Sequence, residues 1–258
     1  MPDLPELPEP LAVLVALGFT GLLVLLRLDA QRFGAAEYAE ADRWGNPPSI
    51  IRRIGWYTLG IGGIVAVATI HPDAAGELFL GTGDRVGAII WGFLYAAGGT
   101  GIALGIAWYR YRYVRVPGLA GYPGGLTNSV ATAFVDEAVF RGLVFGFLVV
   151  SGMDPTLANV TQAMLYALVT RLGAPGRPWY MLAMVLAIGL VSGWMTGVTG
   201  GIGAAFIGHA VTRFAVFLTT GHAGQPMPKG TEDEEIERRH RPPEGWRAIV
   251  SRETSRDR

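Results

Sequence analysis

The chain has 258 residues, enough for one domain of ordinary size or at most two. Half of the residues are hydrophobic and only 16% are charged, whereas a soluble domain carries about 25%, so the composition favours a polytopic membrane protein. The absence of cysteine excludes disulfides, thiolate nucleophiles and cysteine-ligated metals, and equal numbers of basic and acidic residues, 21 of each, argue against a nucleic-acid partner.

Seven apolar segments approach the length that is needed to cross a bilayer. They predict an all-α fold, a polytopic transmembrane helix bundle of about seven spans. The fifth segment is the shortest, because 15 residues at about 1.5 Å each reach only about 22 Å, and we expect a half-span, a sheltered helix or a local thinning of the bilayer there. In chain order the segments are 10–28, 54–70, 86–109, 129–150, 156–170, 179–197 and 202–218.

Lysine and arginine alternate between the loops that connect these spans. Eighteen of the 21 fall on one side of the membrane and one, Arg85, falls on the other, when Arg27 is counted with the first loop. Because positive loops stay in the cytoplasm, this pattern predicts a multi-pass protein of the cell membrane with its N-terminus outside and its C-terminus in the cytoplasm. An acidic stretch precedes the first span and no cleavage site follows it, so we expect this span to remain as an anchor.

Five ionisable side chains lie inside the predicted spans, namely Asp136, Glu137, Arg141, His209 and Arg213. A central Asp or Arg costs about 2.5–3.5 kcal/mol on insertion scales, so these side chains are expected to face the bundle interior and to pair there. Glu137 and Arg141 are spaced i,i+4 on one helix face, and so are His209 and Arg213. Asp136 points about 100° away from Glu137, towards another partner, and lies about 10 Å along its span, so we expect the groups to meet in the cytoplasmic half of the membrane.

The residues alone leave two interpretations of this cluster open. In the first, Glu137 pairs with Arg141, Arg213 neutralises Asp136, and the charges serve packing only. In the second, the carboxylates activate water for hydrolysis while His209 or an arginine stabilises an oxyanion, or the cluster transfers protons or cations. A histidine-rich metal site is not indicated, because zinc normally has three protein ligands and only one of the four histidines lies clearly within a span.

Three short segments resemble the motifs of a known family. Residues 135–142 (VDEAVFRG) resemble the first motif, E-E-x-x-x-R, of the CAAX-protease and bacteriocin-processing (CPBP) family of intramembrane proteases. Residues 166–170 (YALVT) stand where the second motif, F-x-x-x-H, belongs, and residues 209–213 (HAVTR) stand where the third, H-x-x-x-N or H-x-x-x-D, belongs. The resemblance covers about residues 126–218 and implies the fold of that family.

The chain departs from these motifs at three positions. Asp136 replaces the first glutamate, Thr170 replaces the second-motif histidine, which the family uses to activate water or to bind a metal, and Arg213 replaces the third-motif Asn or Asp. The positions that match are Glu137, Arg141 and His209.

The resemblance implies an integral-membrane metallo-endopeptidase that hydrolyses a peptide near the cytoplasmic membrane face by carboxylate-activated water. Asp136 and Glu137 would be base and metal ligand, and Arg141 would hold a carboxylate in place. His209 would be an oxyanion donor or a ligand, and Arg213, a permanent cation, would be a substitute oxyanion donor. Zinc is the metal that the family suggests, with Glu137 and His209 as candidate ligands. The expected partners are the lipid bilayer and a membrane-associated peptide or protein substrate, not nucleic acid.

A second hypothesis is a non-catalytic relative that binds a membrane peptide or a partner protein. It arises because the hydroxyl of Thr170 neither binds zinc well nor takes a proton at neutral pH. A proton-coupled carrier is disfavoured, since the sequence shows no inverted repeat with broken helices.

Two segments outside the spans have their own expected character. Residues 30–53 could form an interfacial helix, which Pro47 and Pro48 would interrupt, and residues 223–258 are expected to be a solvated, partly disordered tail. The predicted organisation is an N-terminal anchor span with a cytoplasmic loop (1–53), two further spans with loops (54–125), a CPBP-like four-span core (126–218) and a charged cytoplasmic tail (219–258).

Overall fold

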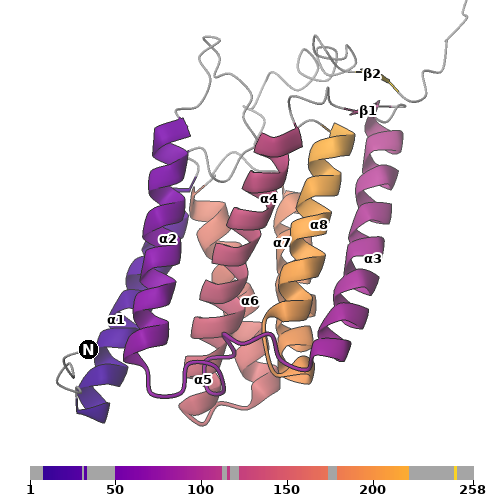
Figure 1. The fold of residues 1–258 in the computed structure, drawn as a ribbon. Helices are drawn as coiled ribbons and strands as arrows, with labels where there is room; N and C mark the ends of the chain where they lie inside the picture. Colours follow the sequence, from indigo (N-terminus) through magenta and orange to yellow (C-terminus); the bar gives the residue numbers. More distant parts are fainter. Residues whose placement is uncertain are drawn as a thin grey trace, which may run out of the picture.

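The computed structural model describes residues 8–30, 32–33, 50–111, 115–116, 122–173, 179–220 and 247–248. Within these residues the chain is a helix bundle whose helices run side by side, and helices that a loop joins are antiparallel (Figure 1). The all-α bundle predicted from the sequence is therefore confirmed. The helices are α1 (Glu9–Leu28), α2 (Ile50–Ile70), α3 (Arg85–Tyr111), α4 (Tyr122–Glu137), η2 (Ala138–Val144), α5 (Phe145–Val150), α6 (Pro155–Gly173), α7 (Trp179–Thr199) and α8 (Gly203–Thr220).

α4, η2 and α5 follow one another without a break and form one rod, residues 122–150. Each of the seven predicted spans thus corresponds to one helix or to this rod. Among the described residues, α1, α2, α3 and α7 are long and apolar enough to cross a membrane, and α8 has a shorter apolar helix, residues 203–219. Large apolar side chains are exposed all round the bundle, as expected of a surface that faces lipid rather than water; examples are Leu14, Ile51, Phe93, Leu172 and Trp194.

All seven predicted spans are longer in the structure than the hydropathy pattern indicated, the fourth by seven residues and the second and fifth by four. The fourth begins at Tyr122 rather than at residue 129. The sequence YPGG resembles a loop, but Pro123 stands in the first helical turn, where the missing N–H of proline costs no hydrogen bond. The fifth was expected to be a short segment of 15 residues, and this expectation is wrong. α6 has 19 residues, about 28 Å, because the helix continues past Arg171 to Gly173.

The two ends of the bundle differ. At one end, which we call the β1 end, α2 begins, α3 and α8 end, and the strand β1 (Arg115–Val116) pairs antiparallel with β2 (Arg247–Ala248) (Figure 1). The opposite end, the α5 end, carries the described connections between α2 and α3, α5 and α6, and α7 and α8. The interfacial helix expected within 30–53 and the tail expected over 223–258 lie almost wholly outside the described residues.

Cysteine labelling tests the predicted orientation, in which the β1 end is cytoplasmic. The chain has no native cysteine, so single cysteines introduce no background. Asp73→Cys and Ser151→Cys, at exposed positions of the α5 end, are expected to react with an impermeant thiol reagent in intact cells. Gly118→Cys and Gly230→Cys are expected to react only after permeabilisation. Labelling of Gly230→Cys from outside would contradict the predicted topology.

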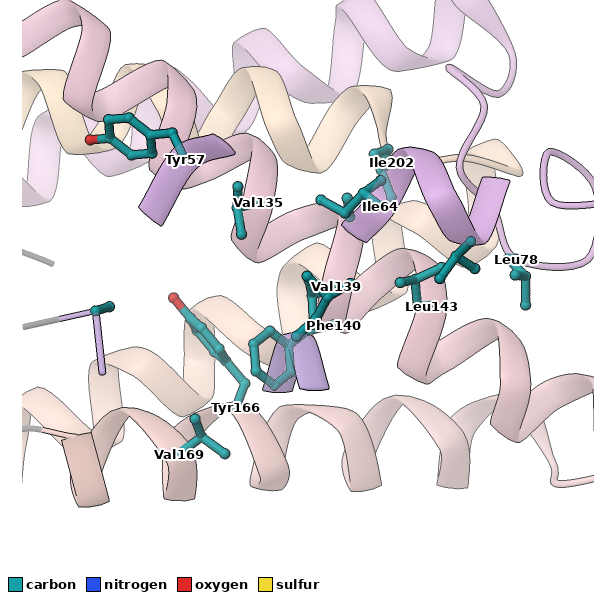
Figure 2. Packing of buried hydrophobic residues seen from close by; sticks show 14 of the residues in the cluster. Tyr57, Ile64, Leu78, Val135, Val139, Phe140, Leu143, Tyr166, Val169 and Ile202 are labelled. Atoms are coloured by element: carbon teal, nitrogen blue, oxygen red, sulfur yellow. The ribbon is translucent and has the colours of Figure 1, made fainter. Parts of the chain in front are cut away.

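The buried core surrounds the rod where it passes through η2. Figure 2 shows Val139, Phe140 and Leu143 among buried side chains of α2 and α6, with Leu78 beside them. Leu78 belongs to the connection between α2 and α3, and it is completely buried although it lies in a loop. The loop therefore enters the α5 end of the bundle and packs against the rod.

Gly146 allows this close approach of loop and rod. A Cβ atom at position 146 would lie 2.6 Å from the Cα of Leu78 and 2.7 Å from the carbonyl oxygen of Glu77, two backbone atoms that cannot rotate away. Gly146→Ala is therefore expected to lower the free energy of unfolding by about 1–3 kcal/mol. Gly98→Ala in α3 is the matched control, because no atom lies within 4 Å of its added methyl group, and it should be neutral or slightly stabilising. Equal melting temperatures of the two variants in detergent would argue against the packed loop.

Candidate active site

The two adjacent carboxylates lie where α4 passes into η2. Asp136 and Glu137 are the last residues of α4, and η2 continues the rod as a π-helix. π-Helical segments are rare in proteins, and many of those that occur lie at functional sites. The extra residue in the turn changes the direction in which the side chains point. Asp136, Glu137 and Arg141 are completely buried.

Glu137 is held from two sides. Its Oε2 lies 3.3 Å from Nε of Arg141, and its Oε1 lies 2.5 Å from Nδ1 of His209. The contact predicted between Glu137 and Arg141 is therefore present, and α8 contributes a second partner. When Nδ1–H of His209 donates to the carboxylate, Nε2 is the basic nitrogen of the ring, and the tautomer is set by this bond.

Asp136 is neutralised by an arginine from the first helix, not by Arg213 as the packing interpretation expected. Nε of Arg27 lies 2.7 Å from Oδ1 of Asp136, and the Tyr166 hydroxyl donates to Oδ2 at 3.2 Å. Arg27 was counted with the first loop, but it belongs to the last turn of α1 and is buried. The end of α1 is fixed beside α2, because the indole N–H of Trp56 donates to the carbonyl of Leu26 at 3.0 Å.

Tyr166 joins the two ion pairs into one cluster. The Arg141 guanidinium lies over the Tyr166 ring at 4.3 Å from the centroid, a cation–π contact, while the hydroxyl of the same residue bonds Asp136. When the His209 imidazole is neutral, the two negative charges of Asp136 and Glu137 equal the two positive charges of Arg27 and Arg141. The cluster then has no net charge, which lowers the free-energy cost of its burial.

Several polar atoms around the cluster have no hydrogen-bond partner in the described part of the chain. They include Oγ1 of Thr170, Nη1 and Nη2 of Arg141, and Nε and Nη2 of Arg213. Thr170 lies one turn beyond Tyr166 on α6, and Arg213 lies one turn beyond His209 on α8, where the charge of Asp136 acts on it. Buried polar atoms without partners cost about 1–3 kcal/mol each, so these atoms are the natural contacts for water or for a substrate.

The cluster lies at mid-height of the rod, and its expected position in the cytoplasmic half of the membrane stays a prediction. Asp136 is 14 residues from Tyr122, where the rod begins, and 14 residues from Val150, where it ends, or about 21 Å from either end. The sequence-based estimate of about 10 Å was too short because it started the span seven residues late.

Comparison with known families assigns the segment that carries this cluster. A family model described as Rce1-like, type II CAAX prenyl endopeptidase, matches residues 117–215. This segment is similar to that family, and we call it the Rce1-like domain. The match confirms the resemblance to the CPBP intramembrane proteases that the three motifs indicated. No curated protein and no solved structure matches the chain significantly. The Rce1-like domain contains every motif residue, whereas Arg27 and the whole of α2 lie outside it.

The donor set of the Rce1-like domain does not fit a zinc ion. A catalytic zinc takes three protein ligands, and the described residues contain no group of three or more His, Cys, Asp or Glu side chains that could hold a metal. Glu137 and His209 bond each other, Asp136 is held by Arg27, and Thr170 offers only a hydroxyl. Glu137 and His209 are therefore better placed to exchange a proton than to share a metal.

A polar stripe along α4 leads from the β1 end to Asp136, and the sequence analysis missed it. The Tyr57 hydroxyl donates to Oδ1 of Asn128 at 2.5 Å, and the Thr132 hydroxyl donates to the same oxygen at 3.1 Å. Asn128, Thr132 and Asp136 succeed one another at i,i+4, so they share one helix face. This spacing was the available signal, but neutral polar residues near a span end are easily assigned to a loop.

Proposed function

We propose that the Rce1-like domain hydrolyses a peptide bond of a membrane-associated substrate with water activated by a carboxylate. The observation that carries the proposal is the position of Glu137, buried between the Arg141 guanidinium and the His209 imidazole. A carboxylate so oriented can act as a general base and has a second group with which to exchange its proton. The family description names an endopeptidase, which supports peptide hydrolysis over proton transport.

In the proposed reaction, Glu137 accepts a proton from water while the water oxygen attacks the carbonyl carbon of the scissile bond. Arg141 keeps Oε2 of Glu137 in place, and His209, in contact with Oε1, takes part in moving the proton to the leaving amine nitrogen. Bond breakage then gives a carboxylic acid and an amine. All of this chemistry uses side chains of η2, α4 and α8.

The tetrahedral intermediate carries a negative charge on oxygen that needs N–H donors. Arg213 is the proposed donor, because its Nε and Nη2 have no partner among the described residues and it lies one turn from His209. Asp136 is the second carboxylate of the proposed site, with its direction fixed by Arg27 and Tyr166. The substrate peptide is proposed to reach the cluster from the cytoplasmic membrane face, which the family resemblance implies and which is the β1 end in the predicted orientation.

One observation favours a second candidate function. Asp136, Glu137 and Arg141 are fully buried in a cluster whose charges balance, which is all that a non-catalytic relative requires. Such a protein would bind a membrane peptide or a partner protein without cleaving it.

Proteolysis of membrane-anchored peptide libraries by the purified chain separates the two candidates. The wild type is expected to cleave slowly, and the activity is expected to survive chelators because the described residues offer no third ligand beside Glu137 and His209. Thr170→His, which restores the second-motif histidine, is expected to raise the rate of cleavage or to create zinc binding. Thr170 lies one turn from Tyr166, whose hydroxyl donates to Asp136. Stoichiometric zinc in the wild type would contradict the ligand assignment, and folded but inactive proteins in all cases would favour the non-catalytic relative.

A further inference from the structure

Two arginines near the β1 end face the bundle interior without an acidic partner among the described residues. Arg53 lies in the first turn of α2, and Arg213 lies seven residues before the last residue of α8. Nε and Nη2 of both guanidinium groups are buried and make no hydrogen bond within the part of the chain that the structure describes. A buried cation without a counter-ion is unfavourable, so the pair is suited to receive an anion.

Both arginines act on the same tyrosine. Tyr57 follows Arg53 by one helical turn on α2, and its hydroxyl lies within electrostatic reach of Arg53, Arg213 and the paired carboxylate of Asp136. This hydroxyl bonds the amide oxygen of Asn128 on α4, which carries no charge. α2, α4 and α8 therefore surround one polar region with two positive charges.

The carboxylates of the neighbouring cluster are already paired with other arginines. Asp136 is occupied by Arg27 at 2.7 Å, and Glu137 is occupied by Arg141 at 3.3 Å. Arg53 and Arg213 are thus the surplus cations of the described helices that meet here. Their ligand must carry its own negative charge.

The depth of the two residues indicates which anion is available. At 1.5 Å per residue, Arg53 is about 5 Å from the start of α2, and Arg213 is about 10 Å from the end of α8. The ends of membrane-spanning helices lie in the headgroup layer of the bilayer, where phosphate is the abundant anion. A guanidinium group binds phosphate through two parallel N–H···O bonds, and basic pockets between helices at this depth bind acidic headgroups.

We propose that Arg53, assisted by the positive charge of Arg213, binds the phosphate of an anionic phospholipid between α2, α4 and α8 at the β1 end. A net negative headgroup is preferred over a zwitterionic one because two cations of the described helices are left without a paired carboxylate. The site lies on the face of the polar stripe that leads to Asp136, yet lipid binding requires no peptidase activity.

Lipid titrations of the purified full chain in detergent test the proposal. Phosphatidylglycerol is expected to raise the melting temperature saturably, whereas phosphatidylcholine with the same acyl chains and inorganic phosphate are expected to have little effect. Arg53→Gln should weaken the apparent affinity for phosphatidylglycerol about tenfold or more, as expected for loss of a charged hydrogen bond. Arg52→Gln is the matched control, because Arg52 is adjacent but exposed, and it should change the affinity less than about twofold.

Without lipid, Arg53→Gln is expected to leave the melting temperature unchanged or higher, since it removes a charge that has no partner among the described residues. Equal weakening by Arg52→Gln and Arg53→Gln would overturn the proposal in favour of diffuse surface attraction. Stabilisation by inorganic phosphate alone would make free phosphate the ligand. Stabilisation by a peptide with a free C-terminal carboxylate, but not by its amidated form or by lipid, would make a peptide the occupant. Because every arm measures binding, these results are independent of whether the chain cleaves peptides.

Discussion

Arg27→Met is expected to lower the free energy of unfolding by about 3–5 kcal/mol, because it leaves the charge of Asp136 buried without its partner. Nε of Arg27 lies 2.7 Å from Oδ1 of Asp136, and both side chains are almost inaccessible to solvent. The contact that remains, from the Tyr166 hydroxyl, is a hydrogen bond and cannot neutralise a carboxylate. A loss of this size is a large part of the 5–15 kcal/mol that stabilises an ordinary domain.

A double-mutant cycle and a matched control make this prediction specific. Asp136→Asn alone leaves Arg27 uncompensated, so the variant that carries both changes should be more stable than the sum of the single effects predicts. Arg32→Met is the control, because Arg32 pairs with Asp29 at 3.1 Å while its side chain is 84% exposed, and such a pair contributes about 1 kcal/mol or less. Additive losses at Arg27 and Asp136, in thermal or chemical unfolding, would show that the two residues are not coupled.

Sequence patterns were sufficient to predict the residues at the centre of the cluster but not those at its periphery. Glu137 and Arg141 could be paired because i,i+4 spacing is a local property, and His209 could be placed because an ionisable residue inside a span must face the interior. Arg27 could not be assigned in this way. An arginine in the last turn of a span usually extends towards the interface, and only packing shows that this one turns inwards to a carboxylate more than a hundred residues later in the chain.

The helix boundaries and the π-helix show a similar limit. A hydropathy pattern predicts that the fourth span begins where the apolar run begins. The helix itself begins earlier, at Tyr122, where the backbone can already be helical. The π-helical segment has no local sequence signature in this chain. Its surroundings are set by tertiary packing, since Gly142 and Gly146 admit the buried loop residue Leu78 from another part of the sequence. The boundaries between the four predicted segments stay predictions.

Glu137→Gln is expected to reduce the proposed peptidase activity about 10²–10⁴-fold, because an amide cannot accept the proton of the attacking water. The substitution keeps the size and shape of the side chain. It therefore removes the negative charge at position 137 while changing the distances to Arg141 and His209 little. The structure predicts an accompanying loss of stability, because Arg141 is fully buried and would lose its counter-ion. Activity must therefore be measured per folded protein, at a temperature at which the variant retains its structure.

Glu77→Gln is the control that separates base catalysis from a general effect of removing a carboxylate. Glu77 also pairs with a histidine, since its Oε2 lies 3.7 Å from Nε2 of His71, but this pair belongs to the α5 end and Glu77 is half exposed. Its replacement should leave the rate of cleavage unchanged. Arg141→Met gives a further distinction, because it removes the group that orients Glu137 and keeps the base itself, and it should therefore retain more activity than Glu137→Gln at equal folded fraction. If folded Glu137→Gln cleaved as fast as the wild type, Glu137 would be a packing residue, and the balanced charges of the cluster would serve the non-catalytic alternative.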